Sequence, residues 1–135
     1  MKNLILAVLL VIGYGFTTNA QTVKTMALAA GDTAVDAGTS AKVLPVLSKG
    51  YAGVAVQVRL TRNSGTAGGS LVVQGSLDGS NWTTIGSAFT PTNVASQSTM
   101  FYISEPVPYY VRTLLTGTGT MNVTQTVRYI LRTHD

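Results

Sequence analysis

The sequence predicts an all-β fold: an antiparallel β-sandwich or jelly roll of about seven or eight strands, preceded by an N-terminal hydrophobic signal helix. Three observations support this prediction. Short segments of alternating apolar and polar residues recur between turns rich in Gly, Ser, Pro and Asn. Beyond the leader, no segment shows a helical period. Only 10% of the residues are charged against 45% hydrophobic, so Thr, Ser, Asn and Gln must fill most exposed positions, as is typical of β-rich extracellular or virion proteins.

The N-terminus is predicted to be a secretory signal peptide. Lys2 precedes an unbroken apolar run from Leu4 to Ile12, and the small residues of Thr17–Ala20 lead up to Gln21 as signal cleavage requires. A retained transmembrane anchor is the alternative, but the apolar part is shorter than the roughly 20 residues that a bilayer span needs. The leader, with Asn19, Ala20 and Gln21 at its end, is similar to those of exported proteins from Bacteroidetes-type bacteria.

This division assigns residues 1–20 to the signal peptide and residues 21–135 to a single β-sandwich domain. The expected location is secreted or at the cell surface after cleavage, with membrane contact only through the signal segment. A virion component is the alternative location. The chain has no cysteine, so a disulfide framework and thiolate metal sites are excluded.

The start of the mature chain carries weak strand signals. Val23–Ala29 is expected to pair as an edge strand, and Gly31–Ser40 is small and polar enough to form a loop. Lys42–Leu47 is an apolar run that Pro45 interrupts, which indicates an edge or a bulge because proline has no ladder donor. The next segment, Val54–Thr61, alternates valine and leucine with mainly polar residues and predicts a half-buried strand.

A β-hairpin is predicted over Gly69–Gly86, after a flexible connection. Leu71, Val73 and the residues alternating with them form the outgoing strand, and Asp78–Asn81 supplies residues suited to a tight turn. Trp82, the only tryptophan, opens the return strand. Its ring could lie across the hairpin or be presented beside the loop as a binding surface.

The remaining strands follow the hairpin. Phe89–Gln97 is predicted to be a loop, Thr99–Ser104 a short strand, and Tyr109–Leu115 a strand that leads through a glycine-rich turn into Met121–Arg132. At about 3.3 Å per residue, the last strand would span roughly 40 Å. Such a length predicts a bulge or a protruding end.

Catalytic residue patterns are missing from the sequence. The one histidine, His134, lies beside the C-terminus, where fraying is expected. The five acidic residues are widely spaced without a recognisable pair, and serines lack a positioned base. We therefore predict that the chain is not an enzyme and has no cofactor. A small hydrolase would require an acid pair that forms only in space.

A metal site is the less favoured reading of three acidic residues. Asp32 and Asp36 could approach a calcium ion from one loop and Asp78 from another, because calcium takes several oxygen ligands. The favoured reading makes Asp78 a turn former and leaves the other two to solvate a loop, so no metal is predicted.

The positive charge does not form a run. The net charge is +4, but without a Lys/Arg cluster a nucleic-acid partner is disfavoured. The arginines fall mostly on polar strand faces, where they could pair with a neighbouring subunit or an anionic polymer. Solvation and edge protection are the commoner roles. These arginines are Arg59, Arg62, Arg112, Arg128 and Arg132.

The hairpin and the strands after it resemble two protein families. Ser76–Thr83, followed by Tyr109–Arg112, is similar to the hairpin and return strand of discoidin-like, galactose-binding-type sandwich modules. The same residues, with a last strand like Gly117–Arg132, resemble small β-sandwich proteins of tailed-phage virions. The first resemblance implies glycan or lipid-surface binding by loops at one end of the sandwich. The second implies a decoration or appendage subunit that assembles through its faces and edges.

Only three positions can be carried over as candidate binding residues: Asp78, Asn81 and Trp82. The leading hypothesis is an exported, non-catalytic structural or assembly subunit of a surface or virion-like particle, whose long last strand could add to a neighbour's sheet. The alternative is a secreted carbohydrate-binding module that uses the Asp78–Trp82 hairpin loop. The expected partner is therefore a second copy of the chain, or a protein or glycan surface.

Overall fold

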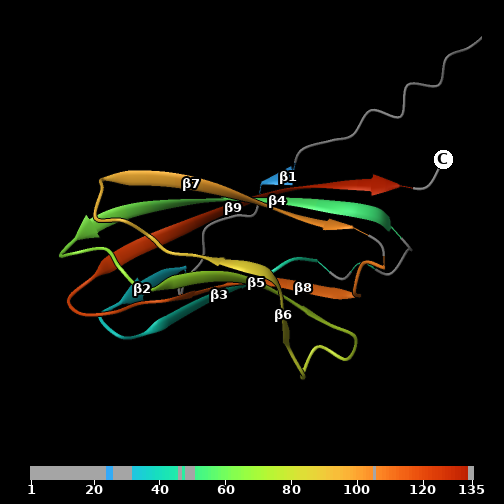
Figure 1. The fold of residues 1–135 in the computed structure, drawn as a ribbon, viewed down its shortest axis with the longest axis horizontal. Coiled ribbons are helices and arrows are strands. Elements are labelled where there is room, and N and C mark those ends of the chain that lie inside the picture. The colour runs from blue at the N-terminus through green and yellow to red at the C-terminus, as the bar shows by residue number, and fades with distance from the viewer. Residues whose placement is uncertain (1–23, 26–31, 46, 48–50, 105, 134–135) are drawn as a thin grey trace, which may run out of the picture.

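The computed structural model describes residues 24–25, 32–45, 47, 51–104 and 106–133, and folds them into two antiparallel β-sheets that pack face to face (Figure 1). The predicted all-β sandwich is thereby confirmed. Within these ranges, no helix is long and apolar enough to cross a membrane. The predicted leader, residues 1–20, lies outside the described residues, so export and cleavage stay predictions.

Sheet A holds the longest strands and sheet B carries the predicted hairpin (Figure 1). The strand order in sheet A is β1 (Lys24–Thr25), β9 (Asn122–Thr133), β4 (Tyr51–Ser64) and β7 (Ser96–Ser104), and β2 (Thr33–Val35) also pairs with β9. The order in sheet B is β3 (Thr39–Val43), β8 (Tyr110–Thr116), β5 (Ser70–Ser76) and β6 (Thr83–Phe89). The β5–β6 hairpin extends away from the body of the sandwich in Figure 1.

The core lies between the two sheets and follows from the period of two in the sequence. In β4, Val54, Val56 and Val58 are buried, whereas Arg59 is exposed. Their partners in β9 share the same inner face, because residues paired in register point to the same side of a sheet. Leu71 in β5 and Leu115 in β8 pack from sheet B. The alternating pattern that predicted these strands is therefore the pattern of the core.

The last strand is long and internal rather than protruding. β9 pairs with β4 from Asn122 to Thr133, and the register shifts leave Ala52 and Asn63 as extra residues in β4. The predicted bulge is thus confirmed, but it lies in the partner strand. The edge of β9 away from β4 pairs with β1 and β2 over a few residues only, so the addition of this strand to a neighbour's sheet stays a prediction.

One expected loop in fact holds two short strands, β2 in sheet A and the start of β3 in sheet B, which a tight turn connects. Gly31–Ser40 was expected to be a loop, but β2 and the start of β3 lie within it. Ala34 is fully buried, and Asp36 takes a left-handed φ of 51° in the turn. Three small strand residues are too few to show a periodic pattern, so pairing with β9 decides their conformation. Of the edge strand predicted over Val23–Ala29, Lys24–Thr25 forms β1 at the edge of sheet A, and the other residues lie outside the described ones.

Two loop boundaries also shift by a few residues. The expected loop Phe89–Gln97 begins after β6 ends at Phe89, and β7 already starts at Ser96. Pro45 lies just beyond the end of β3 at Val43, which agrees with its lack of a ladder donor. The buried Leu44 and Leu47 still contribute to the core after the strand has ended.

A buried polar cluster crosses the core between the sheets. Gln125 of β9 donates from Nε2 to the carbonyl and hydroxyl oxygens of Ser40 in β3, each at 2.8 Å. Its Oε1 accepts a hydrogen bond of 2.8 Å from the Thr113 hydroxyl in β8. Beside it, Lys42 Nζ lies 2.8 Å from both carboxylate oxygens of Asp32. Among the described residues, no buried side-chain nitrogen or oxygen is left without a partner.

Candidate functional site

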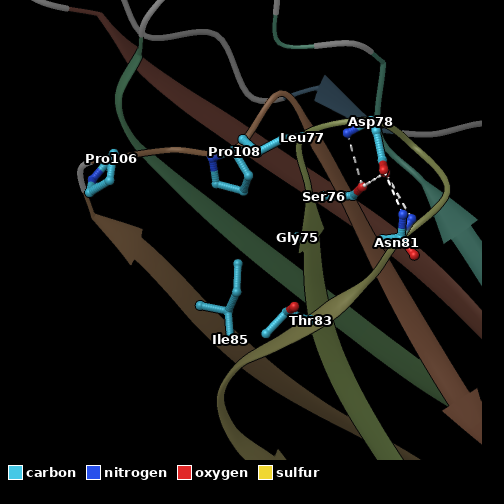
Figure 2. A pocket seen from close by; sticks show the side chains of 9 residues that line it. All are labelled: Gly75, Ser76, Leu77, Asp78, Asn81, Thr83, Ile85, Pro106 and Pro108. Carbon is cyan, nitrogen blue, oxygen red and sulfur yellow. Dashed lines mark hydrogen bonds between the residues drawn. The ribbon is translucent and has the colours of Figure 1, made fainter.

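Asp78 builds the hairpin loop from within. Its Oδ1 accepts hydrogen bonds of 2.8 Å from the backbone N–H groups of Ser80 and Asn81. Its Oδ2 accepts one of 2.7 Å from the Asn81 side-chain amide, and the Ser76 hydroxyl donates to Oδ1 at 2.9 Å (Figure 2). Gly79 takes a φ of 74° at the turn. The carboxylate is therefore occupied by its own loop, as the turn-former reading of the sequence predicts.

The same hydrogen bonds change the acidity of Asp78. The backbone N–H and side-chain amide of Asn81, then the Ser80 N–H and the Ser76 hydroxyl, hold the pKa of the Asp78 carboxyl well below its ordinary value of 3.8. All of them donate to the ionised form and so favour it. Because the folded pKa is depressed, the carboxylate stabilises the loop above the ordinary pKa. That contribution is lost as the pH falls toward the lowered value.

We expect this loop to resist mild acid. The amide proton resonances of Ser80 and Asn81 should stay constant from neutral pH to about pH 4 and move only at lower pH. In the variant Asp78→Ala, both amides should exchange with solvent several-fold faster at neutral pH, because they lose their acceptor. NMR titration and hydrogen exchange measure both effects. A midpoint of the shifts at or above the ordinary carboxyl pKa would contradict this account.

A pocket of about 440 Å³ opens between the hairpin and the connection that leads from β7 to β8 (Figure 2). Asp78 and Asn81 lie at its polar side. The apolar side is made by Leu77, Ile85, Pro106 and Pro108. Two of the three predicted site residues thus line one pocket, with Asp78 turned toward its own loop.

Trp82 is the third predicted residue, and it lies elsewhere. It is not among the residues that line this pocket. Its ring lies over the guanidinium of Arg112 in β8, with 4.2 Å between Cζ and the ring centroid, a cation–π distance. The side chain is partly exposed and is not part of the buried core. The ring therefore lies across the sheet and also forms part of its surface.

A short chain of hydrogen bonds supports Arg112 beneath the ring. Arg112 Nε donates to Gln74 Oε1 at 2.8 Å, and Gln74 Nε2 donates to the Thr84 hydroxyl at 3.3 Å. Gln74 is paired in register with both Thr84 and Arg112, so all three project from the outer face of sheet B. We call Trp82, Arg112, Gln74 and Thr84 the Trp82 platform.

The sequence placed Arg112 on a polar face, but it did not show that Arg112, Gln74 and Thr84 meet beside Trp82. Gln74 and Arg112 each stand at a polar position of an alternating strand, which predicts only that they face outward. Gln74 and Arg112 are 38 residues apart in the sequence, so their meeting depends on the pairing of β5 with β8. An outward glutamine and arginine on strands near a lone tryptophan would have been the available signal.

The outer face of sheet A holds a second concave area that the sequence did not single out. It is a groove of about 540 Å³ across β7, β4 and β9, lined mostly by polar side chains. Arg59 and Arg128 stand in it. Beyond one end, Tyr102 is 76% exposed.

The acidic residues do not form a metal site in the part of the chain that the structure describes, where no three His, Cys, Asp or Glu side chains gather closely enough to hold an ion. Asp32 is paired with Lys42, Asp36 lies in the turn between β2 and β3, and Asp78 is bound within its loop. His134 lies outside the described residues. The prediction that the chain is not an enzyme stays a prediction.

Comparison with family models finds no match, and neither does comparison with curated proteins. Among solved structures, the fold is similar to one described as "Family 16 Carbohydrate Binding Module-2", with a TM-score of 0.44 and 11% identity over 69% of this chain and 70% of that chain. A second is described as "A novel family GH115 4-O-Methyl-alpha-glucuronidase, BtGH115A, with specificity for decorated arabinogalactans". Its TM-score is 0.38 at 13% identity, over 75% of this chain but 14% of that chain.

Values this low assign the chain to neither family. This chain matches only a small part of the glucuronidase. Neither of the two structures is described as a virion protein or a discoidin-like module, so both family resemblances of the hairpin stay predictions.

Proposed function

We propose that this chain is a non-catalytic carbohydrate-binding module that takes a neutral glycan on the outer face of sheet B, with Trp82 as its stacking surface. The proposal rests on one observation: the Trp82 ring lies against the Arg112 guanidinium, with Cζ 4.2 Å from the ring centroid, outside the core and partly exposed. It develops the alternative function predicted from the hairpin. The assembly hypothesis stays a prediction: β9 pairs with β4 along one edge, and β1 and β2 cover parts of its other edge.

The chemistry of the platform suits a sugar ring. A pyranose has apolar C–H faces and a rim of hydroxyl groups, so it needs a flat apolar surface with hydrogen-bonding groups beside it. Trp82 supplies the flat surface. Gln74, Thr84 and Arg112 supply amide, hydroxyl and guanidinium groups around it. One face of the indole contacts Arg112, so the proposal places the sugar on the opposite face.

The platform is also held in place before a ligand arrives. Arg112 is fixed by its bond to Gln74, and Gln74 is in turn bonded to Thr84. A ring that already lies on a fixed guanidinium loses little conformational freedom when a sugar stacks on it, and such preorganisation favours binding. Asp78 has a positioning role in this proposal, because its hydrogen bonds shape the loop that ends just before Trp82.

The test uses Trp82→Ala against a panel of soluble neutral polysaccharides: β-glucan, β-mannan, xylan and galactan. We expect the wild-type chain to be retarded in gels that contain at least one of them. Trp82→Ala should weaken that binding by about 2 kcal/mol, or roughly 30-fold in Kd, because it removes the aromatic ring on which the sugar stacks. Calorimetry with the retarding polysaccharide measures the Kd.

Tyr102→Ala is the matched control, since it removes an exposed aromatic ring from the opposite sheet. It should leave the binding of the neutral polysaccharide within about twofold. Circular dichroism must show the wild-type sheet spectrum for both variants. The proposal fails if no neutral polysaccharide retards the wild-type chain, or if a folded Trp82→Ala variant binds as tightly as the wild type.

A further inference from the structure

The outer face of sheet A presents a second surface, independent of the Trp82 platform. Registered pairs place its outward side chains in rows that run across β7, β4 and β9. One row contains Ser98, Arg59 and Thr126, and the next contains Met100, Gln57 and Arg128. Successive rows lie about 6.6 Å apart along the strands. The groove of about 540 Å³ follows these rows and is within the size range of ligand sites.

The charge of this face is positive and uncompensated by its own side chains. Arg59 and Arg128 are diagonal neighbours on adjacent strands, close enough for their like charges to repel each other. Arg59 uses Nε for a 3.0 Å bond to the Ser96 hydroxyl. Within the described residues, the exposed side chain of Arg128 has no hydrogen-bond or ion-pair partner. Every outward position of the paired rows is neutral or basic.

The far end of the face offers an aromatic ring. Tyr102 is 76% exposed and shares a row with Ala55 and Ile130. This row lies next to the row of Arg128, so the basic groove and the aromatic surface are continuous. From the row of Thr61 to the row of Tyr102, the face extends roughly 20 Å along the strands. Small hydroxyl and amide side chains occupy the space between the charges.

We propose that the outer face of sheet A binds a linear acidic polysaccharide. Carboxylates of the polymer pair with Arg59 and Arg128, whose planar guanidinium groups match a carboxylate in two parallel hydrogen bonds. A sugar ring of the same polysaccharide stacks on Tyr102. The serine, threonine and glutamine side chains of the groove bind the hydroxyl groups between these points. Nothing in this assignment depends on Trp82, which lies on the other sheet.

A polyuronate fits this face better than a nucleic acid does. Arg59, Arg128 and Arg132, on a face otherwise lined with neutral residues, supply few phosphate contacts, whereas nucleic-acid affinity grows with the number of phosphates neutralised. One exposed tyrosine also gives little stacking for successive bases. An acidic glycan, in contrast, carries separated charges and many hydroxyl groups. The ligand chemistry is thus a carboxylated sugar polymer.

The experiment measures the Kd of the full chain for polygalacturonate, with neutral galactan as the uncharged comparison. The double variant Arg59→Gln/Arg128→Gln keeps polar side chains but removes both charges. We expect it to weaken polygalacturonate binding by at least about 30-fold, and Tyr102→Ala to weaken it by about fivefold. Raising the salt concentration should weaken wild-type binding, since the paired charges are exposed.

Two controls separate this surface from general charge and from the Trp82 platform. Arg112→Gln removes one positive charge from the opposite sheet, and it should leave polygalacturonate binding within about twofold, whereas Arg128→Gln alone should weaken it about tenfold. Trp82→Ala should also leave this binding unchanged. Failure of the neutral-glycan proposal would therefore not remove this one, and the reverse also holds.

Several results would overturn the proposal. They are the absence of wild-type binding to polygalacturonate, an equal loss in Arg112→Gln and Arg128→Gln, or an unchanged Kd in Tyr102→Ala. Equal affinity for single-stranded DNA of matched charge would show general polyanion binding and would also overturn it. A sulfated galactan that competes only weakly would support recognition of carboxylate. Thermal unfolding must show that each variant is folded, as expected because none of these side chains is in the buried core.

Discussion

Replacing Gly69 with alanine is expected to destabilise the sandwich by about 4 kcal/mol or more. Gly69 has a φ of 98°, and an added Cβ would lie 2.0 Å from the backbone oxygen of Thr116. Thr116 cannot move aside easily, because it ends β8 and is paired with β3 and β5. Since domains of this size are stable by only about 5–15 kcal/mol, much of the stability would be lost.

Gly86→Ala is the matched control for this substitution. Gly86 also has a positive φ, of 72°, but an added Cβ would meet no atom within 4 Å. This variant should therefore lose only the cost of the left-handed conformation, about 1–2 kcal/mol. Urea unfolding followed by tryptophan fluorescence measures both variants. Equal shifts of the two midpoints would mean that the contact with Thr116 contributes nothing and that the explanation is wrong.

The strands could be predicted where burial alternates over many residues. Val54–Thr61 and Met121–Arg132 carry that alternation because one side of each strand faces the core and the other faces solvent. Thr33–Val35 could not be predicted in the same way. That strand has only 3 residues, and its conformation is decided by pairing with β9. The strand conformation of a long periodic segment can thus be predicted from its own sequence, whereas that of a short segment depends on the strand with which it pairs.

In the candidate site, too, the local contacts could be predicted from the sequence, whereas contacts between distant strands could not. The role of Asp78 could be predicted because an aspartate binds backbone groups a few residues away in its own turn. The position of Trp82 over Arg112 could not, because it depends on which strands are neighbours and in what register. The arginines of the basic groove could be assigned to polar faces open to an anionic polymer, but their meeting in one groove could not be predicted. Arg59 and Arg128 come together only when β4 pairs with β9.

The second large effect is expected at the buried polar cluster. Gln125 and Thr113 are each 0% exposed and share a hydrogen bond of 2.8 Å. Gln125→Leu would leave the Thr113 hydroxyl buried without this partner, and Thr113→Val would do the same to the Gln125 carbonyl. Each variant should lose about 2–3 kcal/mol of unfolding free energy, because a buried unpaired polar group keeps its full cost of desolvation.

The double variant Thr113→Val/Gln125→Leu tests the origin of that loss. With both partners apolar, no group of this pair is left unpaired, so we expect a total loss close to that of one single variant. The coupling energy should then be about 2 kcal/mol, measured by a double-mutant cycle of urea unfolding. Strict additivity would mean that the two losses come from packing alone and that the hydrogen bond carries none of the effect.

The place of this cluster explains why a core made mainly of aliphatic side chains keeps it. Gln125 belongs to sheet A, whereas its partners Ser40 and Thr113 belong to two strands of sheet B. Apolar contacts tolerate sliding of one sheet over the other, but these hydrogen bonds are satisfied in one arrangement only. We therefore expect the double variant to keep its sheet content while its core methyl resonances broaden. Sharp, wild-type resonances would show that aliphatic packing alone fixes how the sheets meet.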